Sequence, residues 1–393
     1  MALSAGTRRT VACVLVGLGA LLIVAALMIP TYTVSKMAKT PLDLEITTVA
    51  VNQKDQESLV LDSSSLTAEG RSAEVNKNVP LVSQRFLTVE DPSDADEMTI
   101  QAGNTLRRID KSGDTGVLTA YVDRVTIDRT TGEPVAADPN GSIAITTNSK
   151  GEALADPVQH TGLQYRFPIG TEKKTYPYFD VLARTTTDME FQEETEINGT
   201  KVYHFRQNVP VTNLNDVSKA PTNKLELPAA KWGVEGGEEP VTMYRFYGNT
   251  RDVWVEPETG TVVKGGEQLN IFYGRSADKV EVQALKANMV FDTDTVESQL
   301  AVAKDNIDTL SLFGRVLPIV FGIIGVLALI AGIALGLTGG RGGNPARPTG
   351  PTGRRPGGSS PVAASAADAP TTTLPRTGDA DAPTETIKLP KNL

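Results

Sequence analysis

Two apolar stretches decide the fold of this chain, Val11–Ile29 (VACVLVGLGALLIVAALMI) and Val316–Leu337 (VLPIVFGIIGVLALIAGIALGL). They contain 19 and 22 residues, and neither includes a charged side chain. About 20 apolar residues suffice to cross the hydrocarbon core of a bilayer. A soluble core helix rarely stays uncharged over such a length, so both stretches are predicted to be transmembrane helices.

The first stretch could instead be a cleaved signal peptide, since Arg8 and Arg9 precede it. It is longer than the usual apolar region of about 7–15 residues, and no clean A-x-A cleavage site ends it. Pro30 and the aromatic Tyr32 are typical of an exit from the bilayer. These features favour an uncleaved signal anchor.

Basic residues set the expected orientation. Arg8 and Arg9 precede the first span, and Arg341 and Arg347 follow the second. The positive-inside rule then places both termini in the cytoplasm and the main domain outside the plasma membrane. The predicted segments are a cytoplasmic stub (1–10), a transmembrane helix (11–30), an extracytoplasmic domain (31–315), a second transmembrane helix (316–337) and a cytoplasmic tail (338–393).

Charge separates along these segments. The 393 residues carry a net charge of −9, which divides into +2 for the stub, −14 for the external segment and +3 for the tail. An acidic domain argues against nucleic-acid binding. One cysteine, Cys13, excludes an intramolecular disulfide and a cysteine-based zinc site. With two histidines besides, we expect neither a metal nor a cofactor. The absence of cysteine from the external segment and the Ala/Thr/Asp/Val-rich composition indicate an actinobacterium-like bacterial chain.

Strand patterns dominate the external segment, which is predicted to be a large antiparallel β-rich domain within a membrane-anchored α+β fold that is mainly β. Asn198-Gly199 predicts a hairpin turn. The expected strands are 116–127, 189–197, 201–209, 241–247, 252–255, 261–264, 269–273 and 279–287.

A juxtamembrane helix is predicted over 293–313, because apolar residues there recur at helical spacing. Asp294 and Glu297 resemble a capping box, and Gly314 with Pro318 suggests a hinge. This helix is either packed on the sheet or a stalk that couples the domain to the membrane. Within the second span, Ala328, Gly332 and Gly336 have the four-residue spacing that lets helices pack closely.

The tail is rich in Pro, Gly and Thr and is predicted to be disordered. Its LPRTG string at 374–378 is not a sortase signal, because no apolar span follows it. Acidic residues precede Thr386 and the apolar Ile387 and Leu389 follow it, a pattern favoured by bacterial Ser/Thr kinases, so Thr384 and Thr386 are candidate phosphorylation sites. A plain solubilising tail is the alternative.

No nucleophile elbow, metalloprotease helix, P-loop or dinucleotide fingerprint occurs in the chain. His160 and His204 are expected to be structural, and no catalytic residue is assigned. A carboxylate pair acting on a glycoside is left as an alternative. A non-enzymatic protein is therefore predicted.

The segment from His160 to Asp180 combines aromatic and basic residues: HTGLQYRFPIGTEKKTYPYFD. It either covers one end of the sheet or forms the rim of an apolar cleft, where basic groups would face an anionic head group or a sugar phosphate. The candidate ligand-binding residues are Tyr165, Arg166, Phe167, Lys173, Lys174, Tyr176, Tyr178 and Phe179.

The string QYRFPIGTEKKTYPYFD, the earlier PLVSQRF and the two flanking spans resemble the actinobacterial porin PorA family. The resemblance covers nearly the whole chain up to the second span. It implies a role in lipomannan and lipoarabinomannan maturation, and a fold similar to the ectodomain of class B scavenger receptors. An acidic segment between two helices predicts a tethered module instead of a membrane-embedded barrel.

The leading functional hypothesis is a non-enzymatic envelope protein that binds or conveys lipid or lipoglycan outside the plasma membrane. The second is a scaffold or accessory subunit of a membrane glycosyltransferase. An exported hydrolase is the third, and an adhesin, a sensor or a true pore are further options. A through-going tunnel would favour the first hypothesis, and a solid core the second.

Overall fold

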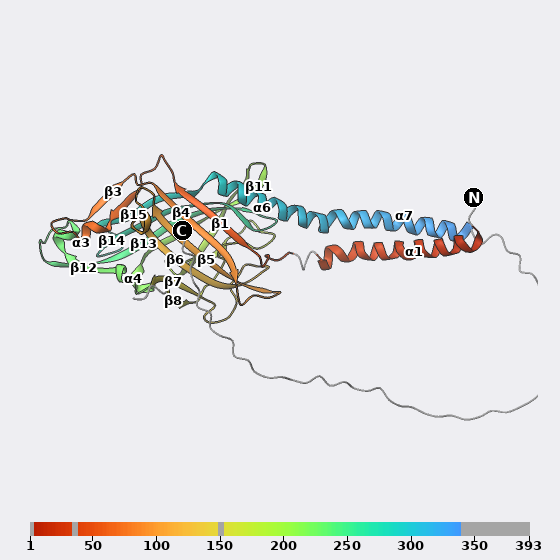
Figure 1. Cartoon of the computed structure of the whole chain (residues 1–393), viewed down its shortest axis with the longest axis horizontal. Coiled ribbons are helices and arrows are strands. Elements are labelled where there is room, and N and C mark those ends of the chain that lie inside the picture. The colour runs from red at the N-terminus through yellow and green to blue at the C-terminus, as the bar shows by residue number, and fades with distance from the viewer. Residues whose placement is uncertain (1–3, 34–37, 148–152, 339–393) are drawn as a thin grey trace, which may run out of the picture. The chain divides into compact units, whose positions relative to one another are not determined.

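The computed structural model describes residues 4–33, 38–147 and 153–338, and Figure 1 shows the arrangement of their elements. The long helices are α1 (Ala5–Met28), α6 (Thr293–Ser311) and α7 (Leu317–Thr338). The short helical turns are η1 (Ile29–Thr33), α3 (Ser63–Thr67), η2 (Gly113–Gly116), α4 (Leu214–Val217), η3 (Pro221–Asn223), α5 (Ala229–Trp232) and η4 (Leu312–Val316).

The rest is β-structure. The strands are β1 (Glu45–Asn52), β2 (Leu59–Asp62), β3 (Glu74–Lys77), β4 (Leu81–Glu90), β5 (Glu97–Arg108), β6 (Val117–Asp128), β7 (Gly141–Thr147), β8 (Ala153–Val158), β9 (Tyr176–Asp180), β10 (Thr185–Ile197), β11 (Thr200–Asn213), β12 (Lys224–Pro228), β13 (Pro240–Glu256), β14 (Thr261–Gly274) and β15 (Val282–Phe291). The prediction of a mainly antiparallel β-rich domain flanked by two long apolar helices is confirmed in this outline.

All of these strands join one sheet among the described residues, in the order β8-β7-β6-β5-β4-β1-β15-β14-β13-β11-β10-β9. β12 is added beside β13, and β2 and β3 beside β15. The predicted hairpin is formed by β10 and β11, and its turn residues Asn198 and Gly199 have φ angles of 48° and 75°. Positive φ at both central positions is what this turn requires.

Two continuous strands replace pairs of shorter expected strands. The expected strands 241–247 and 252–255 are parts of β13, and 261–264 and 269–273 are parts of β14. The gaps between the expected ranges contain Gly248 and the pair Gly265-Gly266, and glycine is depleted in strands. Both lie inside continuous strands, since β13 pairs with β11 on one side and β14 on the other. A Cβ at Gly248 would lie 3.3 Å from Val211 Cγ2, so glycine permits close approach of the neighbouring chain.

The helix predicted over 293–313 corresponds to α6 and begins at Thr293, but its cap lies two residues before the one that the capping box suggests. Asp292, not Asp294, caps it, because the Asp292 carboxylate accepts a hydrogen bond of 2.8 Å from the Thr295 amide. Leu300 and Ala303 of α6 pack against the sheet. At its other end the helix continues through the π-helical turn η4 into α7, so Gly314 lies in a π turn and Pro318 in the first turn of α7.

The helices α1 and α7 lie side by side (Figure 1). Both are long and apolar enough to cross a membrane. Gly332 faces α1 so closely that a Cβ there would lie 2.8 Å from Val16 Cγ2 and 3.0 Å from the Ala12 carbonyl oxygen. A Cβ at Gly336 would be 3.9 Å from Ala12 Cβ, which is ordinary contact. The close approach of the two helices therefore depends on glycine at the contact.

Replacing Gly332 with leucine is expected to separate α1 from α7 by roughly 2 Å, the difference between close and ordinary helix packing. Spin labels at the exposed Leu21 and Leu327, in a chain whose Cys13 is changed to serine, would report the distance by pulsed electron resonance. Gly17→Leu is the control, because no atom lies within 4 Å of a Cβ at that position. Equal distances in both variants would contradict the prediction.

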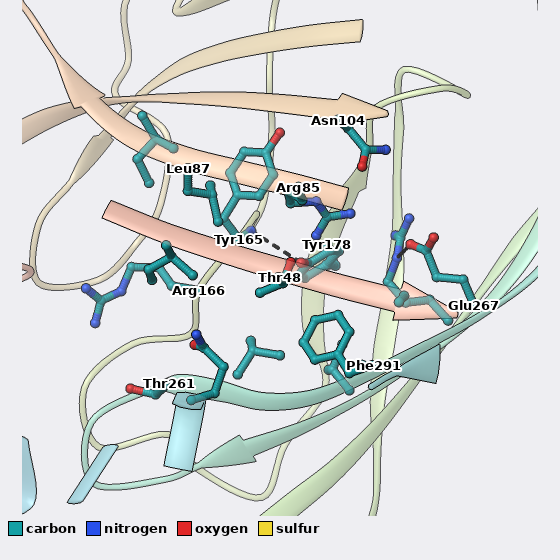
Figure 2. Close-up of a pocket in the computed structure, with 18 of the residues that line it drawn as sticks. Thr48, Arg85, Leu87, Asn104, Tyr165, Arg166, Tyr178, Thr261, Glu267 and Phe291 are labelled. Atoms are coloured by element: carbon teal, nitrogen blue, oxygen red, sulfur yellow. Dashed lines mark hydrogen bonds and ion pairs between the residues drawn. The ribbon is translucent and has the colours of Figure 1, made fainter. Parts of the chain in front are cut away.

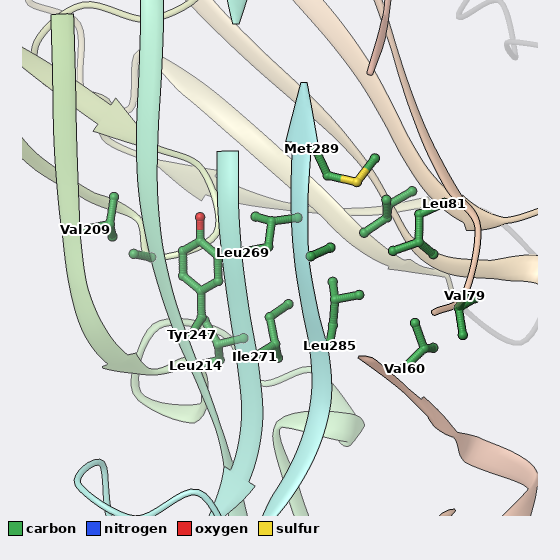
Figure 3. Packing of buried hydrophobic residues seen from close by; sticks show 13 residues of the cluster. Val60, Val79, Leu81, Val209, Leu214, Tyr247, Leu269, Ile271, Leu285 and Met289 are labelled. Atoms are coloured by element: carbon green, nitrogen blue, oxygen red, sulfur yellow. The ribbon is translucent and has the colours of Figure 1, made fainter. Parts of the chain in front are cut away.

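The largest core cluster lies between strands that are distant in sequence (Figure 3). Tyr247 of β13, Leu269 and Ile271 of β14, and Leu285 and Met289 of β15 pack together within it. Because the domain contains no cysteine, burial of this kind supplies its stability. One side of the cluster borders a cavity, described below.

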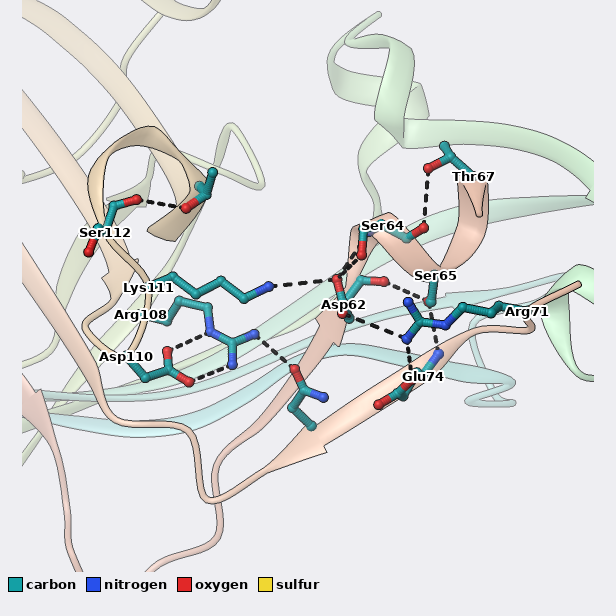
Figure 4. A network of polar contacts seen from close by, with 12 residues as sticks. Asp62, Ser64, Ser65, Thr67, Arg71, Glu74, Arg108, Asp110, Lys111 and Ser112 are labelled. Carbon is teal, nitrogen blue, oxygen red and sulfur yellow. Dashed lines mark hydrogen bonds and ion pairs between the residues drawn. The ribbon is translucent and has the colours of Figure 1, made fainter. Parts of the chain in front are cut away.

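Another part of the domain contains a network of polar contacts around Asp62 and Arg108 (Figure 4). The side chain of Arg108, nearly buried, donates two hydrogen bonds of 2.7 and 2.6 Å to Asp110 and one of 2.9 Å to Asn76. The bonds from Arg108 lower the pKa of Asp110 below its usual value of 3.8. Hydrogen bonds from Ser64 likewise lower the pKa of Asp62.

Asp110→Asn is expected to make the domain less stable at neutral pH. Because the folded-state pKa of Asp110 lies below its unfolded value, its contribution is present above about pH 3.9 and is lost as the pH falls through the folded pKa. The difference in urea midpoint between wild type and variant should therefore shrink from pH 7 to pH 3. Exposed Asp114, whose side chain makes no hydrogen bond within the described residues, provides the control Asp114→Asn. A difference that stays constant with pH would refute this assignment.

Candidate functional site

A cavity of about 300 Å³ lies within the β-rich domain (Figure 2). Its volume is at the lower end of the range seen for small-molecule sites. Strands β1, β4, β5, β6, β13, β14 and β15 all contribute lining residues, together with helix α6 and the segments 38–44 and 165–169. Strand β9 also contributes, through Tyr178 and Asp180. The cavity is therefore built by strands from several parts of the sheet.

One end of the cavity is lined by residues that adjoin the two apolar helices in sequence. Lys39 and Thr40 follow the first helix after a few residues, and Thr309 and Leu310 immediately precede the turn into α7. The opposite part is lined by core residues such as Ile271 and Leu285. The cavity thus extends from helix-proximal segments into the centre of the domain.

A buried ion network lies in one wall. Arg251 donates hydrogen bonds of 2.8 Å to Glu267, 2.9 Å to Asp180 and 2.6 Å to the Gln207 side-chain oxygen. Asp180 also accepts a bond of 2.9 Å from the Tyr247 hydroxyl. Burial opposes ionisation of Glu267, but attraction to Arg251 and Arg85, together with the hydrogen bond from Arg251, outweighs it and holds the pKa below its usual value. Glu267 and Arg251 therefore stay charged in this wall.

Arg85 is a second guanidinium in the cavity lining, and Arg166 is a third (Figure 2). Arg85 lies 5.8 Å over the Tyr165 ring. Its Nε is shut off from solvent, and the side chain forms no hydrogen bond or ion pair within the described residues. Burial opposes its charge, yet attraction to Tyr121 and Glu267 raises its pKa further. The cavity therefore contains a fixed positive charge with free donors.

The segment from His160 to Asp180 is tied to β6 through Asp123. This fully buried carboxylate accepts bonds of 2.9 Å from His160, 2.6 Å from Gln164 and 2.5 Å from the Tyr165 hydroxyl. Tyr165 has a φ of 66°, and its amide donates to the Tyr178 hydroxyl at 3.3 Å. These contacts fix the Tyr165 ring against the cavity.

The structure brings only part of the predicted ligand-binding set to the cavity. Tyr165, Arg166 and Tyr178 line it. Phe167 and Tyr176 are buried in an aromatic cluster with Phe205, and Phe179 is buried in a neighbouring cluster. The exposed side chains of Lys173 and Lys174 form ion pairs with Glu194 and Glu172, away from the cavity lining.

The other candidate residues are placed as follows. Gly332 and Gly336 of α7 face Ala12 of α1, whereas Ala328 lies on the same helix among partly buried positions. Thr384 and Thr386 lie outside the described residues. His160 is buried against Phe179, and His204 Nε2 donates a hydrogen bond of 2.7 Å to the Asp252 carboxylate.

Sequence reasoning missed Arg85, Asp123, Arg251 and Glu267. For Arg85 a signal was present in the PLVSQRF string, because Leu81, Ser83, Arg85 and Leu87 alternate along β4. Side chains two apart share a face of a strand, so this arginine is in phase with two buried leucines. For Arg251 and Glu267 the signal was obscured by the expected strand breaks.

The family model described as Porin PorA matches residues 11–334. A protein named Porin PorA from Corynebacterium amycolatum is 31% identical, over 81% of this chain and 96% of its own length. Another Porin PorA, from Corynebacterium resistens, is 30% identical, over 80% of this chain and 93% of its own length. Together with the two apolar helices, these matches define a membrane protein with a β-rich domain. The chain belongs to the Porin PorA family.

These relatives overturn the predicted function. Both are named porins, which are channel-forming proteins, and neither is named as a lipid- or lipoglycan-binding protein. The prediction that this chain binds or conveys lipid or lipoglycan is therefore wrong, and so is the assignment to lipoglycan assembly. The names equally give no support to the glycosyltransferase scaffold or the hydrolase. Family membership confirms the resemblance found in the sequence. The porin names of the relatives are in line with the expectation of a non-enzymatic protein.

Proposed function

We propose that this chain is a solute-conducting membrane protein of the porin class, and that the cavity of its β-rich domain is the part of the passage that admits small solutes. The observation that carries the proposal is the cavity itself, which extends from residues adjoining both apolar helices to the domain centre. The porin names of the Corynebacterium relatives support it.

The lining suits a hydrated passage. Four cationic side chains and three carboxylates line the cavity: Lys39, Arg85, Arg166, Arg251, Asp180, Asp252 and Glu267. Charged groups of this kind retain water and set the selectivity of channels. Tyr165, Arg166 and Tyr178, from the predicted ligand-binding set, would contact the passing solute.

The topology proposed with this function has both termini in the cytoplasm. Residues 1–10 and 338–393 would lie inside, 11–30 and 316–337 would span the plasma membrane, and 31–315 would lie outside. The basic residues Arg8, Arg9, Arg341 and Arg347 support this orientation. The pairing of α1 with α7 would hold the domain at the membrane surface.

The test is the conductance of the purified full chain in planar lipid bilayers. We expect stepwise current increases after insertion, and passage of small solutes from proteoliposomes whose protein content is verified by immunoblot. Proteoliposomes that contain the inserted chain but retain their solutes as fully as empty ones would contradict the proposal.

A further inference from the structure

A row of four polar side chains crosses four neighbouring strands on one wall of the cavity. Thr48 of β1 is paired with Arg85 of β4, Arg85 with Asn104 of β5, and Asn104 with Tyr121 of β6. All four line the cavity, and Figure 2 labels the first three. Directly opposed side chains in an antiparallel sheet lie about 5 Å apart, so the row is continuous.

The row offers hydrogen-bond donors that the described residues do not use. The Arg85 side chain makes no hydrogen bond to the described residues, and its Nε is buried without a partner. The Thr48 and Tyr121 hydroxyls make no hydrogen bond within the described part of the chain. The Asn104 oxygen has one weak contact, of 3.4 Å with the Ser83 hydroxyl, which leaves its amide hydrogens free. A buried donor without a partner is costly, which indicates that something else supplies the acceptors.

The charge of the row is positive. Glu267 attracts Arg85 through space, but its carboxylate is hydrogen-bonded at 2.8 Å to Arg251. Arg251 also uses Asp180, so both nearby carboxylates are engaged. The Tyr121 hydroxyl stays protonated at neutral pH, since burial raises its pKa to about 12. Asp180 and Glu267 equal Arg85 and Arg251 in number, but both carboxylates accept hydrogen bonds from Arg251 and neither accepts one from Arg85. The donors of Arg85 therefore lack an acceptor, and a negatively charged acceptor forms the strongest hydrogen bonds with a guanidinium.

Apolar side chains supply much of the remaining wall. Leu269 and Ile271 of β14, Leu285 and Met289 of β15, and Phe291 all line the same cavity. An inorganic anion would leave this surface in contact with water. A ligand with an anionic end and a compact apolar body would satisfy both walls.

We propose that the row Thr48–Arg85–Asn104–Tyr121 binds small organic carboxylates, with the carboxylate at Arg85 and the apolar body against β14 and β15. Such carboxylates would be the solutes of the proposed passage, and to that extent the inference rests on the proposed function. Binding at Arg85 can nevertheless be measured without any conductance. Arg85 provides the planar fork that matches a carboxylate, and its position over Tyr165 holds the guanidinium in place.

The test measures equilibrium binding of 4-fluorobenzoate to the full chain in lipid nanodiscs, by fluorine nuclear magnetic resonance. We expect binding by the wild type and much weaker binding of 4-fluorobenzamide, the neutral analogue. Arg85→Gln should weaken 4-fluorobenzoate binding by about tenfold or more, because it removes charge-assisted bonds. Tyr121→Phe removes one hydroxyl and should weaken it several-fold.

Arg107→Gln is the matched control. Arg107 lies on the adjacent strand β5, and its Nε is likewise buried without a partner, but it does not line the cavity. It should bind 4-fluorobenzoate as the wild type does. If Arg85→Gln fails to fold, binding of 4-fluorobenzoate by the Tyr121→Phe and Arg85→Lys variants tests the proposal in its place.

Three results would overturn the proposal. The first is that the wild type does not bind 4-fluorobenzoate, and the second is that it binds 4-fluorobenzamide as tightly as 4-fluorobenzoate. The third is that the Arg85 and Tyr121 variants bind 4-fluorobenzoate as tightly as the wild type does. Binding that depends on Arg85 in a chain that conducts nothing would support this site and refute the passage. Conductance by a chain that does not bind 4-fluorobenzoate at Arg85 would support the passage and refute this site.

Discussion

Replacing Arg251 with methionine is expected to lower the free energy of unfolding of the β-rich domain by about 3–5 kcal/mol. The Arg251 side chain is only 14% exposed, and it bridges Glu267 and Asp180, of which Asp180 is 1% exposed. Methionine would leave two carboxylates without their cation. Removal of one partner from a buried ion pair is costly because the remaining charge is neither solvated nor paired.

Trp232 and Trp254 are both within the domain, so tryptophan fluorescence during urea unfolding of the full chain would measure this change. Arg206→Met is the control. Arg206 pairs with Asp252 at 2.9 Å, but its side chain is 43% exposed, and exposed pairs contribute about 1 kcal/mol or less. Similar losses in both variants would show that the Arg251 network is no more important than a surface pair.

Thr48→Trp is expected to abolish the conductance of the full chain. Thr48 is buried on β1 and lines the cavity. It is paired with Arg85 on the neighbouring strand β4. An indole in its place would occupy space that a solute needs. The neighbouring Thr47 is exposed and lies outside the cavity lining, because successive side chains of a strand point to opposite faces. Thr47→Trp should therefore conduct as the wild type does.

Overpacking also destabilises a domain, by about 1–3 kcal/mol, so both tryptophan variants need a urea midpoint alongside the recording. A folded Thr48→Trp chain with wild-type conductance would show that solutes do not pass through the cavity. A loss in both variants would point to an effect of the strand instead of the cavity.

The general plan of this protein follows from its sequence. The uncharged runs at 11–29 and 316–337 predict the long helices, and alternation with the Asn198-Gly199 turn predicts the β10–β11 hairpin. These signals are local, because each depends on the pattern of a single segment. The family resemblance likewise lay in contiguous strings.

The site depends on pairing between distant segments, which no local pattern encodes. Thr48 meets Arg85, and Arg85 meets Asn104, only once the register of β1, β4 and β5 is known. The aromatic segment was more visible in sequence, yet most of its rings fill the core. Phe167, for example, stacks on Phe205 at 4.9 Å. Aromatic density therefore marked mainly a packing centre beside the cavity, and only Tyr165 and Tyr178 of these rings also line the cavity wall.

The continuity of β13 and β14 is not evident from the sequence for a related reason. Gly248, Gly265 and Gly266 weaken strand formation locally, but ladders on both sides of β13 and β14 offset this cost. The small residues leave room: a Cβ at Gly265 would lie 3.0 Å from the Phe291 ring. Glycine in these strands thus fits close packing next to the cavity, and both Gly265 and Gly266 line it.

The most direct test of the central claim, that solutes pass through this cavity, is chemical modification during a current recording. The full chain would contain Cys13→Ser and a single new cysteine, Thr48→Cys or Thr47→Cys. A cationic methanethiosulfonate reagent should reduce the current of the Thr48→Cys chain, and dithiothreitol should restore it, while the Thr47→Cys current stays constant. A Thr48→Cys chain shown by mass spectrometry to be fully modified, yet with an unchanged current, would contradict the account.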